Sequence, residues 1–435
     1  MVRRRDPDRP LAGVAASDRR VLLKQGGTAL ARPTLPSVRL IRMKRAHAAG
    51  ATIPTLIAAL ALVRCSADEP GTVAGAGAPD CGAEAVGDGG VTDGAVVDAA
   101  DPRCQTQPTL LTTHPHAAVQ DSSVGTNLID TRGWNGRVYF GYGDINWNTG
   151  PIVISSYDPT TKTWEDHLTF NTERIERLRV IGDHLWAPAT DPRGDADPEY
   201  AIGSAQHEWS EVDIGRSIKV LDVAERAAGD VFLVGSDLYL SDAGTFDNTF
   251  GAAAWRSQNG GPFERAFPII NPDPFQDYQY VDMNALPFLN AAALDGKLYA
   301  GTVAPPWIFD GTEWTKGPQL GGFIHPVTFA GQIVFDALGE LWAFDGTHKK
   351  NLGIQLVETS LAYTFVQDPI AVLNDSEGRI LVVNAKLETL VTTDLVEWHC
   401  IGQAPADVRS IGSLNGTVYF GGPEGRVYGY SAPSW

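Results

Sequence analysis

A short pattern of polar and apolar positions recurs seven times between residue 135 and the C-terminus. In each copy a glycine in a polar turn lies two positions before three strand-forming residues, or three positions before them in the second copy. The copies are "NGRVYF", "GDHLWA", "GDVFLV", "DGKLYA", "GQIVFD", "EGRILV" and "NGTVYF", which begin at residues 135, 182, 229, 295, 331, 377 and 415. Asn-Gly, Asp-Gly and similar pairs favour the tight turns that join antiparallel strands. The pattern therefore predicts a β-hairpin in each copy.

A second pattern follows the hairpins and consists of a short strand, a polar turn and an aromatic residue that opens another strand. The segments "SYDPTTKTW", "SAQHEW", "FDGTEW" and "TTDLVEW" end at Trp164, Trp209, Trp314 and Trp398. In the third unit "SQNGGPF" places Phe263 at this position, whereas "FDGTHKK" in the fifth unit lacks the aromatic residue. Each unit therefore consists of four short antiparallel strands.

Four-stranded units that recur every roughly 40 to 50 residues are typical of β-propeller blades. We predict an all-β, seven-bladed β-propeller of four-stranded antiparallel blades over residues 105–435. The last unit contains only three strands, and we expect "TLLTTHPH" at 109–116 to supply the fourth. This strand would close the ring and remove the exposed sheet edges that invite aggregation.

The repeats resemble those of known seven-bladed propellers. "SQNGGPF" and "TTDLVEW" look like degenerate Asp-box repeats of sialidase-type propellers, and "YDPTTKTW" is similar to a kelch-like turn. The resemblance implies the propeller fold and no particular activity.

The N-terminal part of the chain has a different composition. The first aromatic residue is Trp134, so the segment before it contributes little to a packed core. We expect an unstructured or non-native extension at 1–42, a signal peptide at 43–65 and a disordered acidic Ala/Gly/Asp tether at 66–104. The propeller domain, 105–435, follows this leader.

The segment "MKRAHAAGATIPTLIAALALVRC" has the layout of a secretory signal, with Lys44 and Arg45 before a short apolar stretch. It resembles a bacterial lipoprotein signal, which implies lipidation at Cys65. Arg64 departs from that pattern, because a small residue is usual there, and cleavage near Ala67 is the alternative. We expect an exported protein, either an outer-membrane or cell-surface lipoprotein of a bacterium or a periplasmic or secreted one.

The charge of the chain limits the classes of partner that it can bind. The formal net charge is −18, although residues 1–45 are strongly basic. Such an acidic body repels nucleic acid and anionic lipid. We expect no nucleic-acid partner, contact with a membrane only through the lipid anchor, and a monomer.

The four cysteines are Cys65, Cys81, Cys104 and Cys400. If Cys65 carries lipid, one pair should form among the other three in an oxidising compartment. We predict a Cys104–Cys400 disulfide, because Cys104 precedes the closing strand and Cys400 follows Trp398 at the rim of the neighbouring blade. A Cys81–Cys104 pair within the tether is the alternative.

Candidate binding residues lie in long loops that follow the second strands of the first three blades. The first loop, 141–151, contains Asp144, Asn146, Trp147 and Asn148, which suit a sugar or another polar ligand. The alternative is a self-packed turn in which Asp144 and Asn148 bond backbone amides.

The second loop, 188–200, contains Asp191, Asp195 and Asp197, whose oxygen atoms suit Ca²⁺. The alternative is a solvated acidic loop, and we expect no other cofactor. His325 opens the inner strand of the fifth blade, where it either reaches the central funnel or is a buried structural residue.

No nucleophile elbow, P-loop, HExxH or dinucleotide fingerprint occurs in the sequence. We therefore expect an exported, lipid-anchored, non-catalytic propeller that recognises a glycan or protein ligand through its loop-rich face. The alternative is an extracellular carbohydrate-active enzyme, a glycosidase or lyase, on the same scaffold.

Overall fold

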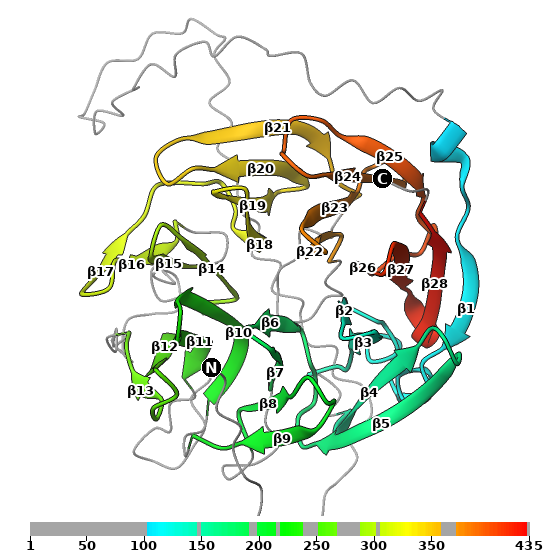
Figure 1. Ribbon diagram of the computed structural model, residues 1–435. Helices are drawn as coiled ribbons and strands as arrows, with labels where there is room; N and C mark the ends of the chain where they lie inside the picture. The colour runs from blue at the N-terminus through cyan, green and yellow to red at the C-terminus, as the bar shows by residue number, and fades with distance from the viewer. Residues whose placement is uncertain are drawn as a thin grey trace, which may run out of the picture. The chain divides into compact units, whose positions relative to one another are not determined.

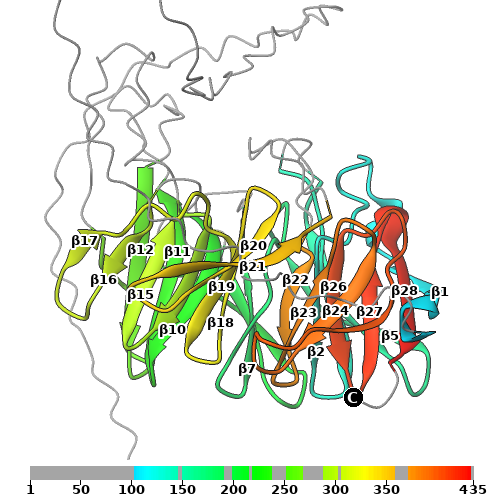
Figure 2. The same cartoon turned by 90° about the horizontal axis from the view of Figure 1, so that it is seen from above.

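The computed structural model describes residues 102–145, 149–190, 198–214, 218–237, 251–267, 288–301, 305–357 and 371–432. Seven four-stranded antiparallel sheets are arranged as blades around a common axis (Figure 1). In the view from above, the strands of each blade run between the two faces of the ring (Figure 2). The only helices in the described ranges are short 3₁₀ turns, and none has the length and hydropathy needed to cross a membrane. The predicted all-β, seven-bladed propeller is confirmed.

The first four blades follow one another along the chain, each from its inner to its outer strand. Blade 1 contains β2 (Asp130–Trp134), β3 (Arg137–Gly141), β4 (Ile152–Asp158) and β5 (Thr163–Phe170). Blade 2 contains β6 (Arg179–Ile181), β7 (His184–Pro188), β8 (Tyr200–Gly203) and β9 (Trp209–Val212). Blade 3 contains β10 (Ile218–Ala227), β11 (Asp230–Asp237), β12 (Gly251–Gln258) and β13 (Glu264–Arg265). Blade 4 contains β14 (Asn290–Leu294), β15 (Lys297–Gly301), β16 (Trp307–Phe309) and β17 (Trp314–Lys316).

The last three blades complete the ring, and the final one combines both ends of the domain. Blade 5 contains β18 (Ile324–Phe329), β19 (Gln332–Ala337), β20 (Glu340–Phe344) and β21 (Lys349–Gln355). Blade 6 contains β22 (Leu373–Ser376), β23 (Arg379–Val383), β24 (Glu388–Thr392) and β25 (His399–Gln403). Blade 7 contains β26 (Ser410–Leu414), β27 (Thr417–Gly421), β28 (Arg426–Ser431) and, as its outer strand, β1 (Thr109–Thr113).

The repeated glycine pattern forms the turns between the first and second strands. Asn135 and Gly136 both have positive φ, 46° and 77°, and Asn415 and Gly416 repeat this geometry with 51° and 71°. Two consecutive positive φ values define the type I′ turn, whose twist matches that of the strands it joins. Asparagine and glycine accept this backbone conformation more readily than other residues. The hairpin prediction is confirmed for all seven blades.

In blades 1, 4, 5 and 6 the polar turn between the third and fourth strands is held by an aspartate that accepts backbone N–H groups. Asp310 Oδ1 accepts hydrogen bonds from the amides of Thr312 and Glu313 at 2.8 and 3.0 Å. These bonds and one from the Thr312 hydroxyl lower the pKa of Asp310 to about 2. Asp394 repeats the arrangement in blade 6. The aromatic residue after the turn packs between blades, as Trp314 does against Phe267.

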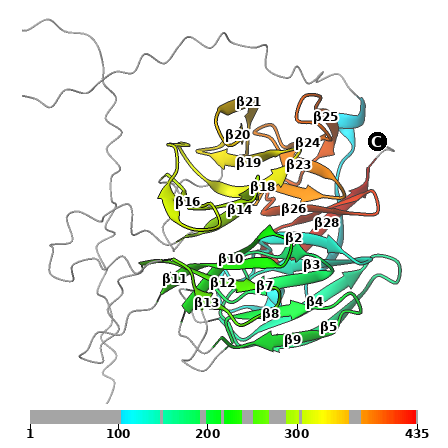
Figure 3. The ribbon, with the colours of Figure 1, turned by 60° about the vertical axis from the view of Figure 1, so that its left-hand side comes forward.

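Ring closure uses the N-terminal segment that the sequence predicted. β1 pairs antiparallel with β28, with Thr109 opposite Gly429 and Thr113 opposite Arg426. In Figure 3 this strand lies alongside the last blade. The closing strand supplies the fourth strand of blade 7, so β28 is not left as an exposed sheet edge.

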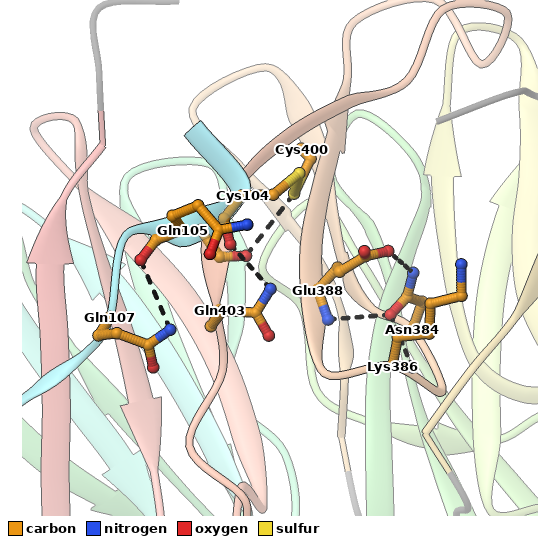
Figure 4. Close-up of a disulfide and its surroundings, with 9 residues drawn as sticks. Cys104, Gln105, Gln107, Asn384, Lys386, Glu388, Cys400 and Gln403 are labelled. Carbon is orange, nitrogen blue, oxygen red and sulfur yellow. Dashed lines mark hydrogen bonds between the residues drawn. A yellow bond between two sulfur atoms is a disulfide. The ribbon is translucent and has the colours of Figure 1, made fainter. Parts of the chain in front are cut away.

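A covalent link reinforces this closure on the preceding blade. Cys104, in the 3₁₀ turn η1 (Pro102–Gln105), forms the predicted disulfide with Cys400 of β25, and both are 2% exposed. The backbone N–H of Gln403 donates a 2.8 Å hydrogen bond to Thr106 O. Its side-chain Nε2 donates another of 2.8 Å to Cys104 O (Figure 4). We call η1, β1 and their links to β25 and β28 the N-terminal clasp. The clasp joins blade 6 to blade 7.

Candidate functional site

The innermost strands of six blades surround a cavity of about 310 Å³ on the axis of the ring. Figure 1 shows β2, β6, β10, β14, β18 and β22 nearest this axis. The cavity is lined by Arg132, Arg179–Gly182, Val223–Glu225, Ala291–Ala293, Pro326–Thr328 and Asp375. Each innermost strand runs toward its first hairpin turn, so these residues lie toward the turn face, opposite the face with the long loops. We call this cavity the axial pocket.

Arg179 links four blades across the axis. Its Nε and Nη2 donate to Asp222 Oδ1 and Oδ2 of blade 3 at 2.8 and 2.7 Å. Nη2 also donates to Ala291 O of blade 4 and Pro326 O of blade 5 at 3.4 and 3.3 Å. Asp222 is 0% exposed and accepts a further 2.9 Å bond from the Ala291 amide. The pair therefore fixes the inner strands of blades 2 to 5 relative to one another.

The electrostatics of this pair favour the charged forms of both partners. Burial alone would lower the pKa of Arg179, but attraction to Asp222 and the hydrogen bonds to it raise the pKa above its ordinary value. Burial alone would raise the pKa of Asp222, but attraction to Arg179 and the hydrogen bonds from Arg179 lower it. A carboxylate held by a bidentate guanidinium has little capacity to act as a general base.

A second arginine connects blade 1 to blade 6. Arg132 Nη1 donates to Asp375 Oδ1 and to Asp375 O, at 2.9 and 2.5 Å. The Arg132 side chain is 10% exposed and that of Asp375 is 41% exposed. The neighbouring Asn374 donates from Nδ2 to Thr131 O of blade 1 at 3.0 Å. These bonds link blade 1 directly to blade 6, and blade 7, which lies between them in the ring, takes no part in them.

Among the residues that line this pocket, Arg132 has a buried Nε with no hydrogen-bond partner in the described part of the chain. A buried polar atom without a partner is unusual in a folded protein and marks a place where water or a ligand can bind. The axial pocket is therefore the strongest candidate site among the described residues.

Of the predicted loop residues, the structure describes only Asp144. Asp144 is 0% exposed, and its Oδ2 accepts a 2.6 Å hydrogen bond from the buried Ser122 hydroxyl. Its backbone N–H donates to Glu173 O at 3.1 Å and to Thr149 Oγ1 at 2.9 Å. Asp144 thus stabilises the base of its loop from inside the protein. The other loop candidates, Asn146, Trp147, Asn148, Asp191, Asp195 and Asp197, lie outside the described residues, as does Cys65.

His325 lies at the start of the inner strand of blade 5, as predicted, and is 4% exposed. Its backbone N–H donates to Asn290 Oδ1 at 3.2 Å, and its φ is +50°. Arg177 of blade 2 donates to the same Asn290 oxygen at 2.9 Å. His325 does not line the axial pocket, whereas the next three residues of its strand do.

A buried serine–histidine pair has the composition of a nucleophile and its base but not the chemistry. His114 Nε2 lies 3.1 Å from Ser155 Oγ, and both residues are buried. His114 Nδ1 accepts the N–H groups of His116 and Ala117, at 3.3 and 3.1 Å. Since Nδ1 is the acceptor, the ring proton is on Nε2, and the imidazole donates to Ser155 rather than activating it. Burial, with the nearby His116, lowers the pKa of His114 to about 3. The pair is structural.

A further cavity of about 400 Å³ lies between the outer strands of blades 3 and 4. Arg256 lines it and donates to Asp230 from Nε at 2.5 Å and from Nη2 at 3.2 Å, while Arg226 occupies the other side of that carboxylate. The Arg256 guanidinium also lies 5.1 Å from the ring centroid of Phe309. These contacts join blade 3 to blade 4. Within the described ranges, no group of three or more His, Cys, Asp or Glu side chains could hold a metal ion.

Arg132, Arg179, Asp222 and Asp375 were not predicted as site residues from the sequence. Their signal was a charged residue inside four of the seven strands that precede a hairpin turn, as in "DTRGW" and "RVI". Such residues are usual on exposed strand faces, so the pattern alone does not distinguish a channel from a solvated surface.

Comparisons with known proteins do not assign a family. Neither models of protein families nor curated proteins gave a match. Among solved structures, the WD40 domain of Pan2 from Neurospora crassa matches with 10% identity and a TM-score of 0.46, over 76% of this chain and 98% of that one. YCF48 from Cyanidioschyzon merolae matches with 12% identity and a TM-score of 0.40, over 71% and 96%. A computationally designed protein, Ika8, matches with 13% identity and a TM-score of 0.40, over 74% and 98%. At these identities the likeness is restricted to the fold.

Proposed function

We propose that the chain is an exported, lipid-anchored and non-catalytic propeller that binds a glycan or protein ligand through its loop-rich face. The observation that carries the proposal is the unequal length of the connections between second and third strands. In blades 1 to 3 they run from Gly141 to Ile152, from Pro188 to Tyr200 and from Asp237 to Gly251. In blade 5 only Leu338 and Gly339 separate the two strands.

The antiparallel order of the strands brings these three connections to the same face of the ring, in neighbouring blades. Long connections on a rigid scaffold are where binding residues concentrate. Asn146, Trp147 and Asn148 would supply stacking and hydrogen bonds there, and the carboxylates of Asp191, Asp195 and Asp197 would bind polar groups or Ca²⁺.

Two features of the structure support the non-catalytic and exported parts of the proposal. The buried carboxylate of Asp222, on the inner strand of blade 3, is neutralised by Arg179, which suits a scaffold rather than an acid or base. The Cys104–Cys400 disulfide fits an oxidising compartment outside the cytosol. Lipid on Cys65, followed by the acidic segment before residue 104, would hold the ring away from a membrane surface.

The test compares the full chain with a Trp147→Ala variant on a glycan array and in crosslinking to surface proteins of the producing cell. We expect at least a roughly tenfold loss of binding in the variant, because truncation of an aromatic hot-spot residue commonly costs about 2 kcal/mol or more. Val396→Ser is the control, since Val396 is 70% exposed in the outer turn of blade 6, away from these loops.

The enzyme alternative is tested in the same samples. Release of new reducing ends, or of unsaturated sugar products, from a bound glycan would overturn the non-catalytic assignment. Undiminished binding after all three long connections are replaced by two-residue turns would overturn the assignment of the face.

A further inference from the structure

We propose that the axial pocket is a second binding site, for a small neutral polyhydroxylated ligand such as a single sugar residue or a cyclitol. This site lies toward the turn face and is formed by residues that the proposed loop-face site does not use. The two sites can therefore be tested separately.

The size and walls of the pocket fit a ligand of this class. A volume of about 310 Å³ lies at the lower end of the range for small-molecule sites. Ala291–Ala293, Val223 and Pro326 are among the lining residues, and none of them has a large side chain. Such walls accommodate the C–H groups of a sugar or cyclitol ring without a bulky side chain to displace.

The charged groups at the pocket leave no excess of positive charge, which disfavours an anionic ligand. Arg132 and Arg179 contribute two positive charges, and Glu225 and Asp375 contribute two negative ones. Arg179 is engaged by Asp222, and Glu225 Oε1 accepts the N–H of Gly229 at 2.8 Å. Because Asp222 and Asp375 already pair with the two arginines and Glu225 adds a further carboxylate, an anionic ligand would meet no excess of positive charge among these groups.

The polar atoms that remain include both a donor and an acceptor. Arg132 Nε–H is buried without a partner, and Arg132 Nη1 bonds only one of the two carboxylate oxygens of the partly exposed Asp375. A hydroxyl group both donates and accepts hydrogen bonds, so adjacent hydroxyls on one ring can satisfy the arginine and the aspartate together. The carbonyl of Asp375 already fixes the guanidinium in place, which lowers the entropy lost on binding.

The experiment titrates the full chain with D-glucose, N-acetylglucosamine and myo-inositol, using calorimetry and saturation-transfer NMR. Glycine serves as the zwitterionic comparison. We expect at least one polyol to bind saturably, one molecule per chain, with a Kd of the order of 1 mM. Absence of saturable binding for every polyol up to about 50 mM, or tighter binding of glycine than of any polyol, would overturn the proposal.

Two tryptophan substitutions locate the site. Val180 lines the pocket and is 43% exposed, so Val180→Trp should obstruct the pocket without disturbing the core and weaken binding at least about tenfold. The matched control is Val396→Trp, at the exposed outer turn of blade 6, which should bind like the unmodified chain. Circular dichroism melts establish that both variants are folded.

Asp375→Asn tests the polar contact, because it keeps the shape of the side chain and removes its charge. We expect about fivefold weaker polyol binding, while Glu165→Asn, which alters the exposed Arg137–Glu165 pair on blade 1, leaves it unchanged. Polyol binding that survives both Val180→Trp and Asp375→Asn would place the ligand elsewhere. If Trp147→Ala abolishes polyol binding while Val180→Trp does not, the loop face is the sugar site and the axial proposal is wrong.

Discussion

Arg179 and Asp222 form a two-point ion pair at the centre of the ring, with N–O distances of 2.8 and 2.7 Å and a carboxylate that is 0% exposed. The same guanidinium reaches the backbone of blades 4 and 5. The inner strand that carries Arg179, β6, has only three residues, so it cannot hold its position through a long ladder of hydrogen bonds. The bonds between Arg179 and Asp222 help to hold β6 in place instead.

Removal of Arg179 should therefore be strongly destabilising. Arg179→Met leaves Asp222 buried without its counter-charge, and we expect a loss of about 3 to 5 kcal/mol in the free energy of unfolding. Denaturant titration followed by tryptophan fluorescence measures it. Arg179→Met combined with Asp222→Asn should recover part of the loss, since the buried charge is then absent.

The control is Arg137→Met, which removes an ion pair with the half-exposed Glu165. Exposed pairs contribute about 0 to 1 kcal/mol, so this change should be small. Equal effects for Arg179→Met and Arg137→Met would show that the axial pair has no special structural weight.

Loss of the disulfide should weaken the whole ring rather than one end of it. The bond joins residues that are 296 positions apart, and the chain-entropy relation gives about 6 kcal/mol for a loop of this length. We expect Cys400→Ser to lower the midpoint of denaturation, measured under non-reducing conditions, and reductant to have the same effect on the unmodified chain. Cys81→Ser should leave stability unchanged. A destabilised Cys81→Ser variant would favour the alternative pairing.

Stability should fall in acid because of His114. Burial and the adjacent His116 hold its folded pKa at about 3, well below the unfolded value near 6.5. The unfolded chain therefore binds a proton that the folded chain rejects, and the folded state loses about 1.4 kcal/mol for each pH unit below 6.5, until pH reaches about 3.

Equilibrium unfolding between pH 7.5 and pH 4.5 measures this slope. His114→Gln should be less stable at neutral pH, because Nδ1 no longer accepts two amides, but its stability should change less with pH. His348→Gln is the control, since its side chain is 82% exposed. An unchanged slope in His114→Gln would assign the acid sensitivity to other groups.

Export and anchoring can be tested in cells. A chain that starts at Met43 should be exported and processed, since the basic and apolar segments of the signal are then intact. Cys65→Ser should release the protein from the membrane fraction into the soluble one, detected by fractionation and mass spectrometry of the N-terminus. An intact, unprocessed N-terminus in the exported fraction would contradict the signal assignment.

The sequence predicted the ring because the information that specifies it is local. Pairs such as Asn135-Gly136 and turn residues such as Asp310 determine the neighbouring backbone directly, and their repetition gives the number of blades. The closing strand was predictable because the last blade contained only three strands of its own.

The axial pocket was not predictable because its contacts join distant positions. Arg132 and Asp375 are 243 residues apart, in blades that are not consecutive, and no repeat of the pattern links them. Similarly, burial of Asp144 depends on Ser122, which precedes the first blade. Such pairings follow from the radius of the ring and the direction of each inner strand, and no single segment of the sequence determines either of these.

The position of the N-terminal clasp determines how the ring would respond to mechanical load. A pulling force applied from the N-terminal side reaches Cys104 before it reaches β1, and it passes through the disulfide into β25 of blade 6. The hydrogen bonds between β1 and β28 lie beyond this covalent junction and are shielded from the force. Such a force therefore does not separate β1 from β28, and a protein tethered by its leader in flowing liquid would keep its ring closed.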